Sequence, residues 1–389
     1  MADTENPKLH RQIDINSTQP PLYRMSAELT ANEMLKEHTI PFHFFRRLSQ
    51  RKESTWIISV FVILHLIAFC ATMIVNDCWR NSHAQCVFRQ LGRFSFQPLS
   101  ENPLLGPSAY GLDAMGALRL RYLTSDHQLW RAFTSPCLHA GVFHLIISLS
   151  SVIFVGVHLE QEFGPCISPA QFRIFSVFIK DGVITKDALI RIGVIYIVSA
   201  LTGGLLAALF LQDRPSVSAS GALFGLLGAT FSGFFQNWKV YSEKTAAIVV
   251  LLIILMLNAI LGLTPLVNNF SNIGGFISGL LVGFMLLFKP NAGKVYQNKE
   301  GIFDYDVKNS TKLKQMLDKP VSRIVCLVIL SLLLVGGGLA LVRGVNVNKY
   351  CDWCKYIDCV PFKWWSCSDK TIRCEYDDKL GALDFDLLE

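Results

Sequence analysis

The sequence predicts an all-α membrane protein, a bundle of apolar helices that cross a lipid bilayer. Of its 389 residues, 51% are hydrophobic and only 17% are charged, and its mean hydropathy is +0.37. A soluble chain carries about a quarter charged residues. Seven apolar runs stand out, and most approach the ~20 residues needed to cross a bilayer: 55–75, 137–158, 192–211, 217–235, 246–263, 273–288 and 324–341.

The fourth and sixth runs reach that length only when the polar residues at their ends are counted as part of the span. Around the runs, the chain divides into a polar N-terminal arm, a six-run core with a long first loop, a basic linker, a last span and a cysteine-rich tail. The arm is mixed in charge and holds no signal peptide, so we expect a disordered cytosolic segment. These parts are, in order, 1–54, 55–288 with its loop 76–136, 289–323, 324–341 and 342–389.

Basic residues set the expected orientation, because loops rich in Lys and Arg stay on the cytosolic side. Arg46, Arg47, Arg51 and Lys52 precede the first span. The linker carries Lys289, Lys294, Lys299, Lys308, Lys312, Lys314, Lys319 and Arg323. With seven spans, the N-terminus and the linker lie in the cytosol, and the tail and the first loop face the lumen or the outside. The short loops on that second side hold one basic residue between them.

The cysteines fit this orientation. The chain has 11, with five in the tail and two in the first loop: Cys351, Cys354, Cys359, Cys367, Cys374, Cys78 and Cys86. All seven lie in the expected oxidising compartment, where disulfides persist. Zinc binding at Cys351-x-x-Cys354 is the weaker interpretation, because no histidine follows the motif. Since five is odd, one tail cysteine pairs with the first loop or stays free. We expect no metal and no cofactor.

Glycines recur at helical spacing in the fourth and sixth spans. They are Gly221, Gly225 and Gly228 in one span and Gly275, Gly279 and Gly283 in the other. Small residues four apart let two membrane helices approach closely. The fourth and sixth spans are therefore the natural pair to touch, although packing alone is a sufficient reason for such spacing.

Ser220 opens the fourth span and is followed directly by Gly221. A serine in a membrane helix usually bonds to a carbonyl one turn earlier. The alternative is a nucleophile, which needs a neighbouring base because the hydroxyl itself is too weak an acid. The sixth span holds no histidine. The spans contain only His65, His139, His144 and His158, and we expect His65 to be a packed or hydrogen-bonded core residue.

Ordered motifs along the chain resemble the rhomboid family of intramembrane serine proteases, in its six-plus-one-span eukaryotic form and most closely its plant members. The likeness covers about residues 45–375. The motifs are "NPLLGPS" (102–108), "MGAL" (115–118), "WRAFTSPCLHAGVFHL" (130–145), "LEQEFG" (159–164), "ASGALFGLLGA" (219–229) and "NFSNIGGF" (269–276). The resemblance implies a rhomboid-type six-helix transmembrane bundle plus a seventh C-terminal span.

The resemblance also implies roles for single residues. Ser220 matches the nucleophile of the family, and His144 lies where the family places an oxyanion-side donor. Trp130 and Arg131 match the first-loop motif that braces the domain, and His139 matches a structural histidine.

The sequence differs from the family at three positions that take part in catalysis. The catalytic histidine of the family is replaced by Asn272, its oxyanion asparagine by Ser148, and the first glycine of its Gly-x-Ser-Gly motif by Ser218. An asparagine amide cannot accept the serine proton at neutral pH. General base catalysis contributes roughly 10²–10⁴-fold and an oxyanion donor another ~10²–10³-fold. His144 could replace the base only if the second and fourth spans shifted.

Residues 166–190 form an atypical insert of mixed apolar and charged residues, where the family has a tight cytosolic turn. An interaction loop and a translated non-coding segment of the gene are both open interpretations.

These observations predict a catalytically impaired rhomboid that binds transmembrane segments of single-span client proteins through a lateral opening between its spans. The alternative is an active serine endopeptidase that cleaves such proteins through Ser220. A channel or transporter is disfavoured, because no span carries the intramembrane charges that mark ion pathways. The basic residues lie beside apolar segments, so they indicate topology and not a nucleic-acid partner. We expect the protein in a bilayer of the secretory pathway, the Golgi or the plasma membrane.

Overall fold

The computed structural model describes residues 40–41, 55–81, 86–163, 183–212, 214–238, 241–242, 244–287, 320–362, 365 and 367. The chain divides into two compact units, Met1–Ile40 and Pro41–Glu389. Of the first unit only Ile40 is described, and every described helix belongs to the second. Most of the predicted N-terminal arm, most of the insert 166–190, the linker up to residue 319 and the end of the tail with Cys374 lie outside the described residues.

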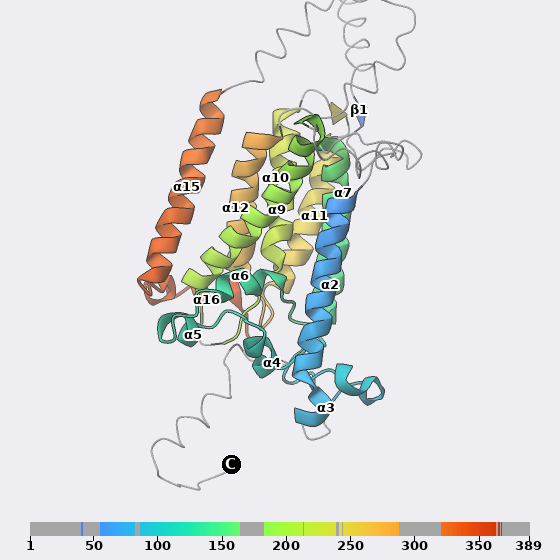
Figure 1. Ribbon diagram of the computed structural model, residues 1–389, viewed down its shortest axis with the longest axis vertical. Helices are drawn as coiled ribbons and strands as arrows, with labels where there is room; N and C mark the ends of the chain where they lie inside the picture. Colours follow the sequence, from blue (N-terminus) through green and yellow to red (C-terminus); the bar gives the residue numbers. More distant parts are fainter. Residues whose placement is uncertain are drawn as a thin grey trace, which may run out of the picture. The chain divides into compact units, whose positions relative to one another are not determined.

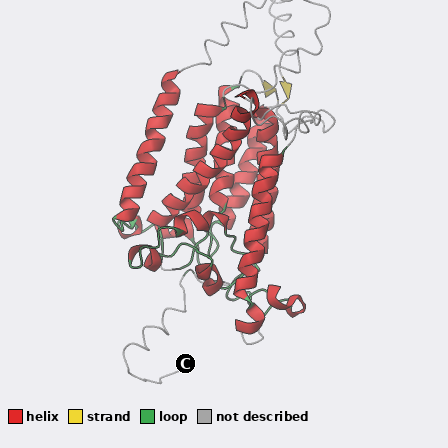
Figure 2. Cartoon of the chain, in the orientation of Figure 1, coloured by secondary structure: helices red, strands yellow, loops and turns green. Residues whose placement is uncertain are grey.

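Seven long helices make up the described part of the fold (Figure 1). They are α2 (Trp56–Asn76), α7 (Val142–Phe163), α9 (Val183–Leu209), α10 (Ser220–Gln236), α11 (Lys244–Leu261), α12 (Asn269–Leu286) and α15 (Pro320–Val342). The only strands among the described residues are the two-residue β1 (Ile40–Pro41) and β2 (Tyr241–Ser242). Figure 2 shows how completely helices dominate. The prediction of an all-α membrane bundle is confirmed.

Six of the seven helices are long and apolar enough to cross a membrane. The exception is α10, with 17 residues, in which every residue from Ser220 to Phe234 is buried. At ~1.5 Å per residue it is about 26 Å long. Because α7, α9 and α12 surround it, α10 meets protein instead of lipid, and it needs neither the length nor the hydrophobicity of a lipid-facing span.

Helix boundaries differ from the predicted runs at two places. The run 137–158 was expected to be one span, but the short 3₁₀ turn η4 (Ser135–Cys137) and a loop precede α7, which begins only at Val142. A Cβ on Gly141 would lie 2.2 Å from the carbonyl oxygen of Leu104, so the chain packs tightly there in a non-helical bend. The run that begins at residue 192 agrees with the apolar span Arg191–Leu209, but the helix that contains this span, α9, begins earlier, at Val183 in the last part of the insert.

The interior of the bundle is apolar and is centred on α10. Its side chains Leu223, Leu226 and Leu227 are fully buried together with Val155 of α7 and Ile192 of α9. Within the described residues, α15 packs at the edge of the bundle, mainly on α9 and α12, and just 6% of its span is buried. The seventh span is thus a lipid-facing addition to a six-helix core (Figure 1).

Short helices gather at the end of the bundle where α10 and α12 begin, which we call the serine end (Figure 1). They are α3 (Cys78–Asn81), η3 (Arg89–Phe94), α4 (Ala109–Ala114), α5 (Leu120–Thr124), α6 (Arg131–Thr134), η4, η5 (Val347–Lys349) and α16 (Cys354–Asp358). Most of them build the long loop between α2 and α7.

Arg131 braces that loop. Its guanidinium donates to the carbonyl oxygens of Asp113 (2.7 Å) and Ala117 (2.9 Å) and to the side chain of Gln128 (2.7 Å). It also lies over the ring of Tyr122, 4.1 Å from the centroid, and 4.9 Å from the ring centroid of the half-exposed Trp130. The buried guanidinium of Arg131 therefore holds together several irregular segments of the first loop.

Six of the seven candidate cysteines form three disulfides: Cys78–Cys86, Cys351–Cys354 and Cys359–Cys367. Each bond closes within its own segment, so no described tail cysteine pairs with the first loop. Cys351 and Cys354, the alternative zinc ligands, are joined to each other.

Candidate functional site

Helices α10 and α12 are in backbone contact, as their glycine spacing predicts. A Cβ on Gly275 would lie 2.0 Å from the carbonyl oxygen of Gly221, and one on Gly279 would lie 2.0 Å from that of Gly225. Neither position can hold a side chain without moving the backbone opposite. The starts of the two helices, with Ser220 on one and Asn272 on the other, are therefore held close together.

Ser220 is the first residue of α10 and is 1% exposed. Its neighbour Gly221 lies against Ser271, whose hydroxyl is 2.5 Å from a Cβ built on that glycine. The Ser220 hydroxyl has no hydrogen-bond partner within the described part of the chain. Nothing in that part accepts its proton, so the hydroxyl is not activated.

The start of α12 explains most of the amide cluster in "NNFSN". Asn268 is the N-cap, and its side-chain oxygen accepts from the backbone N–H groups of Phe270 (2.9 Å) and Ser271 (3.3 Å). These N–H groups have no partner inside the helix, so a side-chain acceptor stabilises the helix start. Asn268 is fully buried, which makes this cap part of the core.

Asn272 shares a face of α12 with Gly275 and Gly279, because residues three and seven apart lie on one side of a helix. Its Nδ2 donates to Oδ1 of Asn269 at 2.7 Å, and its own Oδ1 is buried without a partner among the described residues. The amide is thus held by its own helix and not by Ser220. An amide has no proton affinity that would let it act as a general base near neutral pH.

His144 cannot take over that role in the geometry described. The backbone N–H of Ala140 donates to its Nδ1 at 3.2 Å. A neutral imidazole that accepts at Nδ1 carries its proton on Nε2. That Nε2 is buried without a partner in the described residues, so it can donate a hydrogen bond but not accept the serine proton.

Ser148 and Ser218 occupy the other two altered positions. Ser148 lies one turn after His144 on α7, is 2% exposed and has no hydrogen-bond partner among the described side chains and backbone. The hydroxyl of Ser218 lies 2.7 Å from that of Ser135, and the Ser218 carbonyl accepts from Ser271 at 3.0 Å. The loop before α10 accommodates Ser218 by pairing it with the first-loop side of the site.

His139 and His65 form a row of rings with His144. The ring of His139 is 5.0 Å from that of His65 and 5.1 Å from that of His144. His65 Nε2 is 2.6 Å from the hydroxyl of Tyr196, so the expectation of a hydrogen-bonded core residue is confirmed.

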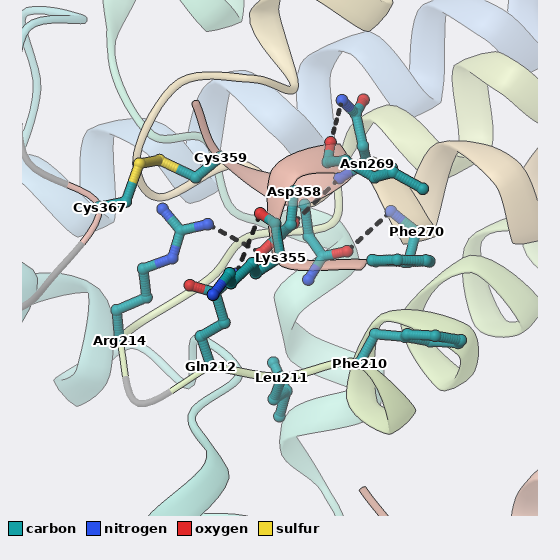
Figure 3. Close-up of polar contacts among 12 residues, drawn as sticks. Phe210, Leu211, Gln212, Arg214, Asn269, Phe270, Lys355, Asp358, Cys359 and Cys367 are labelled. Atoms are coloured by element: carbon teal, nitrogen blue, oxygen red, sulfur yellow. Dashed lines mark hydrogen bonds and ion pairs between the residues drawn. A yellow bond between two sulfur atoms is a disulfide. The ribbon is translucent and has the colours of Figure 1, made fainter. Parts of the chain in front are cut away.

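The C-terminal tail also reaches the site, which the sequence did not predict (Figure 3). Asp358 of α16 accepts from Arg214 at 2.8 Å and from the backbone N–H of Asn269 at 3.3 Å. The side chain of Asn269 donates to the carbonyl oxygen of Ile357 at 2.9 Å. Burial raises the pKa of Asp358 above its ordinary range, and Arg214 and the Asn269 N–H oppose that rise. The one basic residue of the short loops, Arg214, was the only sequence signal for this contact.

The fold and the site define a class: a multi-pass membrane protein built around a buried serine at the start of a central, glycine-packed helix. The chain belongs to the rhomboid family. The Rhomboid domain description matches residues 126–289. That match covers helices α7 to α12 and thus both Ser220 and Asn272.

Relatives extend the match beyond this domain. The chain is 47% identical to Inactive RHOMBOID-like protein 8 of Arabidopsis thaliana over 334 residues, covering 85% of this chain and 88% of the relative. It is 40% identical to RHOMBOID-like protein 1 of Arabidopsis thaliana over 323 residues, covering 82% and 75%. It is 29% identical to Inactive rhomboid protein 1 of Papio anubis over 250 residues, 64% of this chain and 24% of that protein.

Proposed function

We propose that this protein is a catalytically inactive rhomboid that binds transmembrane segments of client membrane proteins. The observation that carries the proposal is the state of the two central residues: Asn272 donates to Asn269, and the Ser220 hydroxyl has no partner among the described residues. The hydrogen bond from the Ala140 N–H to Nδ1 of His144 also supports it, because this bond prevents that nitrogen from accepting the serine proton. Two relatives whose names contain "inactive" add support.

A cleavage assay tests the loss of activity. Purified wild type, Ser220→Ala and Asn272→His are mixed with a single-span membrane protein in vesicles, and fragments are followed on gels. We expect no specific cleavage by wild type or by Ser220→Ala. Cleavage by wild type that disappears in Ser220→Ala would establish the alternative, an active serine endopeptidase. If Asn272→His gains activity, the loss of proteolysis in wild type is due to the missing base. If it gains none, the changes at Ser148 and Ser218 also contribute to that loss.

We expect client helices to bind at the side of the bundle that α11 forms. Only 17% of the α11 span is buried, and its one polar contact to α7 is the bond from Asn258 to Ser151 at 3.0 Å, within the described residues. Among the candidate spans of the six-helix core α11 is the least buried, so it is the core helix that can most easily move aside to admit a client helix. Photo-crosslinkers at Met256 on α11 and at Leu332 on α15, both more than half exposed, test this. We expect a co-expressed single-span protein to crosslink from Met256 more strongly than from Leu332.

We further propose that the N-terminus lies in the cytosol and the serine end in the lumen or outside, in a Golgi or plasma membrane. The basic residues before α2 and in the linker support this, because such residues stay cytosolic. The glycosylation motif Asn309-Ser310-Thr311 lies in the linker. It should stay unmodified in cells, whereas a motif introduced at the exposed Tyr350 should be glycosylated.

A further inference from the structure

The carboxylate of Asp358 bridges two segments that enter the site from different directions (Figure 3). Its Oδ2 accepts from Arg214, in the loop that leads into α10, at 2.8 Å. Its Oδ1 accepts from the backbone N–H of Asn269, the first residue of α12, at 3.3 Å. One side chain of the tail thus contacts the segment before Ser220 and the helix that carries Asn272.

The two segments also meet directly. The N–H of Val217 donates to the carbonyl of Leu266 at 2.8 Å, and the N–H of Asn268 donates to the carbonyl of Val217 at 3.2 Å. This is a single parallel bridge, Val217 with Val267, and is not part of a sheet. An isolated pair of backbone bonds is weak, so additional contacts beside it decide how firmly the segments stay together.

The ion pair between Asp358 and Arg214 is buried, and the hydrogen bonds that Asp358 accepts are of the charged, stronger kind. The side chains of Arg214 and Asp358 are only 6% and 2% exposed. Hydrogen bonds that involve charged groups are roughly twice as strong as neutral ones. In addition, Asn269 stands at the start of α12, where an unpaired N–H and the helix dipole both favour a carboxylate.

The tail holds Asp358 in place by contacts of its own. Asn346 and Asn348 donate to the carbonyl of Leu211, just after α9, at 3.0 and 3.1 Å. Beyond α16, the N–H of Val360 donates to the carbonyl of Leu263, in the loop between α11 and α12, at 3.2 Å. The tail is therefore anchored on both sides of the site, and a disulfide on each side of Asp358 restricts it further.

We propose that Asp358 is a positioning residue of the site: through Arg214 and the Asn269 N–H it holds the loop before α10 against the start of α12, and so fixes Ser220 beside the first turn of α12. The tail is then a component of the site and not an appendage to the seventh span. This role does not depend on whether Ser220 cleaves a substrate, so it goes beyond the proposed function.

Hydrogen exchange of the full-length protein in lipid nanodiscs tests the proposal, read by mass spectrometry at peptides covering 214–221, 266–273 and the tail. Asp358→Ala removes both arms of the bridge. Asp358→Asn keeps an oxygen that can accept from the Asn269 N–H but removes the charge that pairs with Arg214. Asp352→Asn is the matched control, because Asp352 is an exposed carboxylate on the same tail.

We expect Asp358→Ala to speed exchange in both site peptides by on the order of tenfold or more, because tenfold is about the smallest effect expected from losing one hydrogen bond with a charged partner. Asp358→Asn should speed exchange mainly in 214–221. Asp352→Asn should change neither peptide. In Arg214→Lys, which keeps the positive charge, the 214–221 peptide should remain closer to wild type than in Arg214→Ala.

The proposal is wrong if Asp358→Ala speeds exchange in the tail alone, because the carboxylate then stabilises only α16. Equal effects of Asp358→Asn and Asp358→Ala on both peptides would contradict the two-armed bridge. Unfolding of the whole bundle in Asp358→Asn, detected by loss of a monodisperse peak and of helical circular dichroism, would contradict a role confined to the site.

Discussion

Gly275 shows how much of this site depends on the absence of a side chain. The space for its Cβ is occupied by a carbonyl oxygen of the neighbouring helix, 2.0 Å away. A side chain there must push the backbone of α10 away, and with it Gly221 and Ser220. The glycines therefore determine the separation of the two helices that carry the site.

We predict that Gly275→Ala lowers the free energy of unfolding by an amount near or above the top of the ~1–3 kcal/mol range of overpacked cores. The matched control is Gly336→Ala on α15, where an added Cβ meets nothing within 4 Å. Alanine there should be neutral or stabilising by up to ~1 kcal/mol. Thermal unfolding in detergent measures both variants. Equal effects of the two substitutions would contradict the close packing of α10 and α12.

The residue type at position 272 could be interpreted from the sequence alone, because no asparagine titrates near neutral pH. The hydrogen-bond partner of Asn272 could not be predicted from the sequence. The bond from Asn272 to Asn269 depends on side-chain rotamers that no sequence pattern encodes. The same holds for His144. Its identity suggested a possible base, and only the position of the Ala140 N–H assigns its proton to Nε2.

At the scale of elements, apolar runs predicted all seven long helices, and six of these helices are long and apolar enough to span a bilayer. The boundaries depended on local features that hydropathy does not report. The 3₁₀ turn at Ser135–Cys137 and the close approach at Gly141 move the start of α7, and α9 extends into residues that do not look apolar.

The disulfides give a prediction at this scale. Cys359–Cys367 and Cys78–Cys86 have the same sequence separation, 8 residues, so removing either should cost a similar loop-closure term of about 2–3 kcal/mol. Only the tail bond lies next to Asp358. Replacing Cys359 and Cys367 by serine should therefore speed hydrogen exchange at the start of α12, whereas replacing Cys78 and Cys86 should not. A similar change in both variants would show that the effect is global.

At the scale of the whole molecule, the tail and the bundle are joined across a long stretch of chain. Arg214 and Asp358 are 144 residues apart in the sequence. A single sequence carries no information about which distant residues pair. Composition and spacing therefore predict a side of the membrane for the tail, but they do not predict its contact with the site.

This arrangement predicts that the chain can be cut in its linker and still assemble. If residues 1–305 and 306–389 are co-expressed as separate chains, they should co-purify, because the tail contacts and the packing of α15 on α9 and α12 survive the cut. Arg214→Ala combined with Asn269→Ala should weaken co-purification, and Gly336→Ala should not. Failure of the unmutated halves to associate would show that the linker itself holds the seventh span in place.

The burial of α10 also has a consequence for how the protein is made. This helix is 17 residues long and contains Gly221, Gly225, Gly228 and Gly233. It enters the bilayer during translation before α12, which completes its surroundings, has left the ribosome. A short, glycine-rich segment is a poor candidate for stable insertion on its own, so α10 must remain beside α7 and α9, or inside the insertion machinery, until α12 follows. Substitutions on α12 are then expected to impair biogenesis of the membrane protein as well as the stability of the finished bundle.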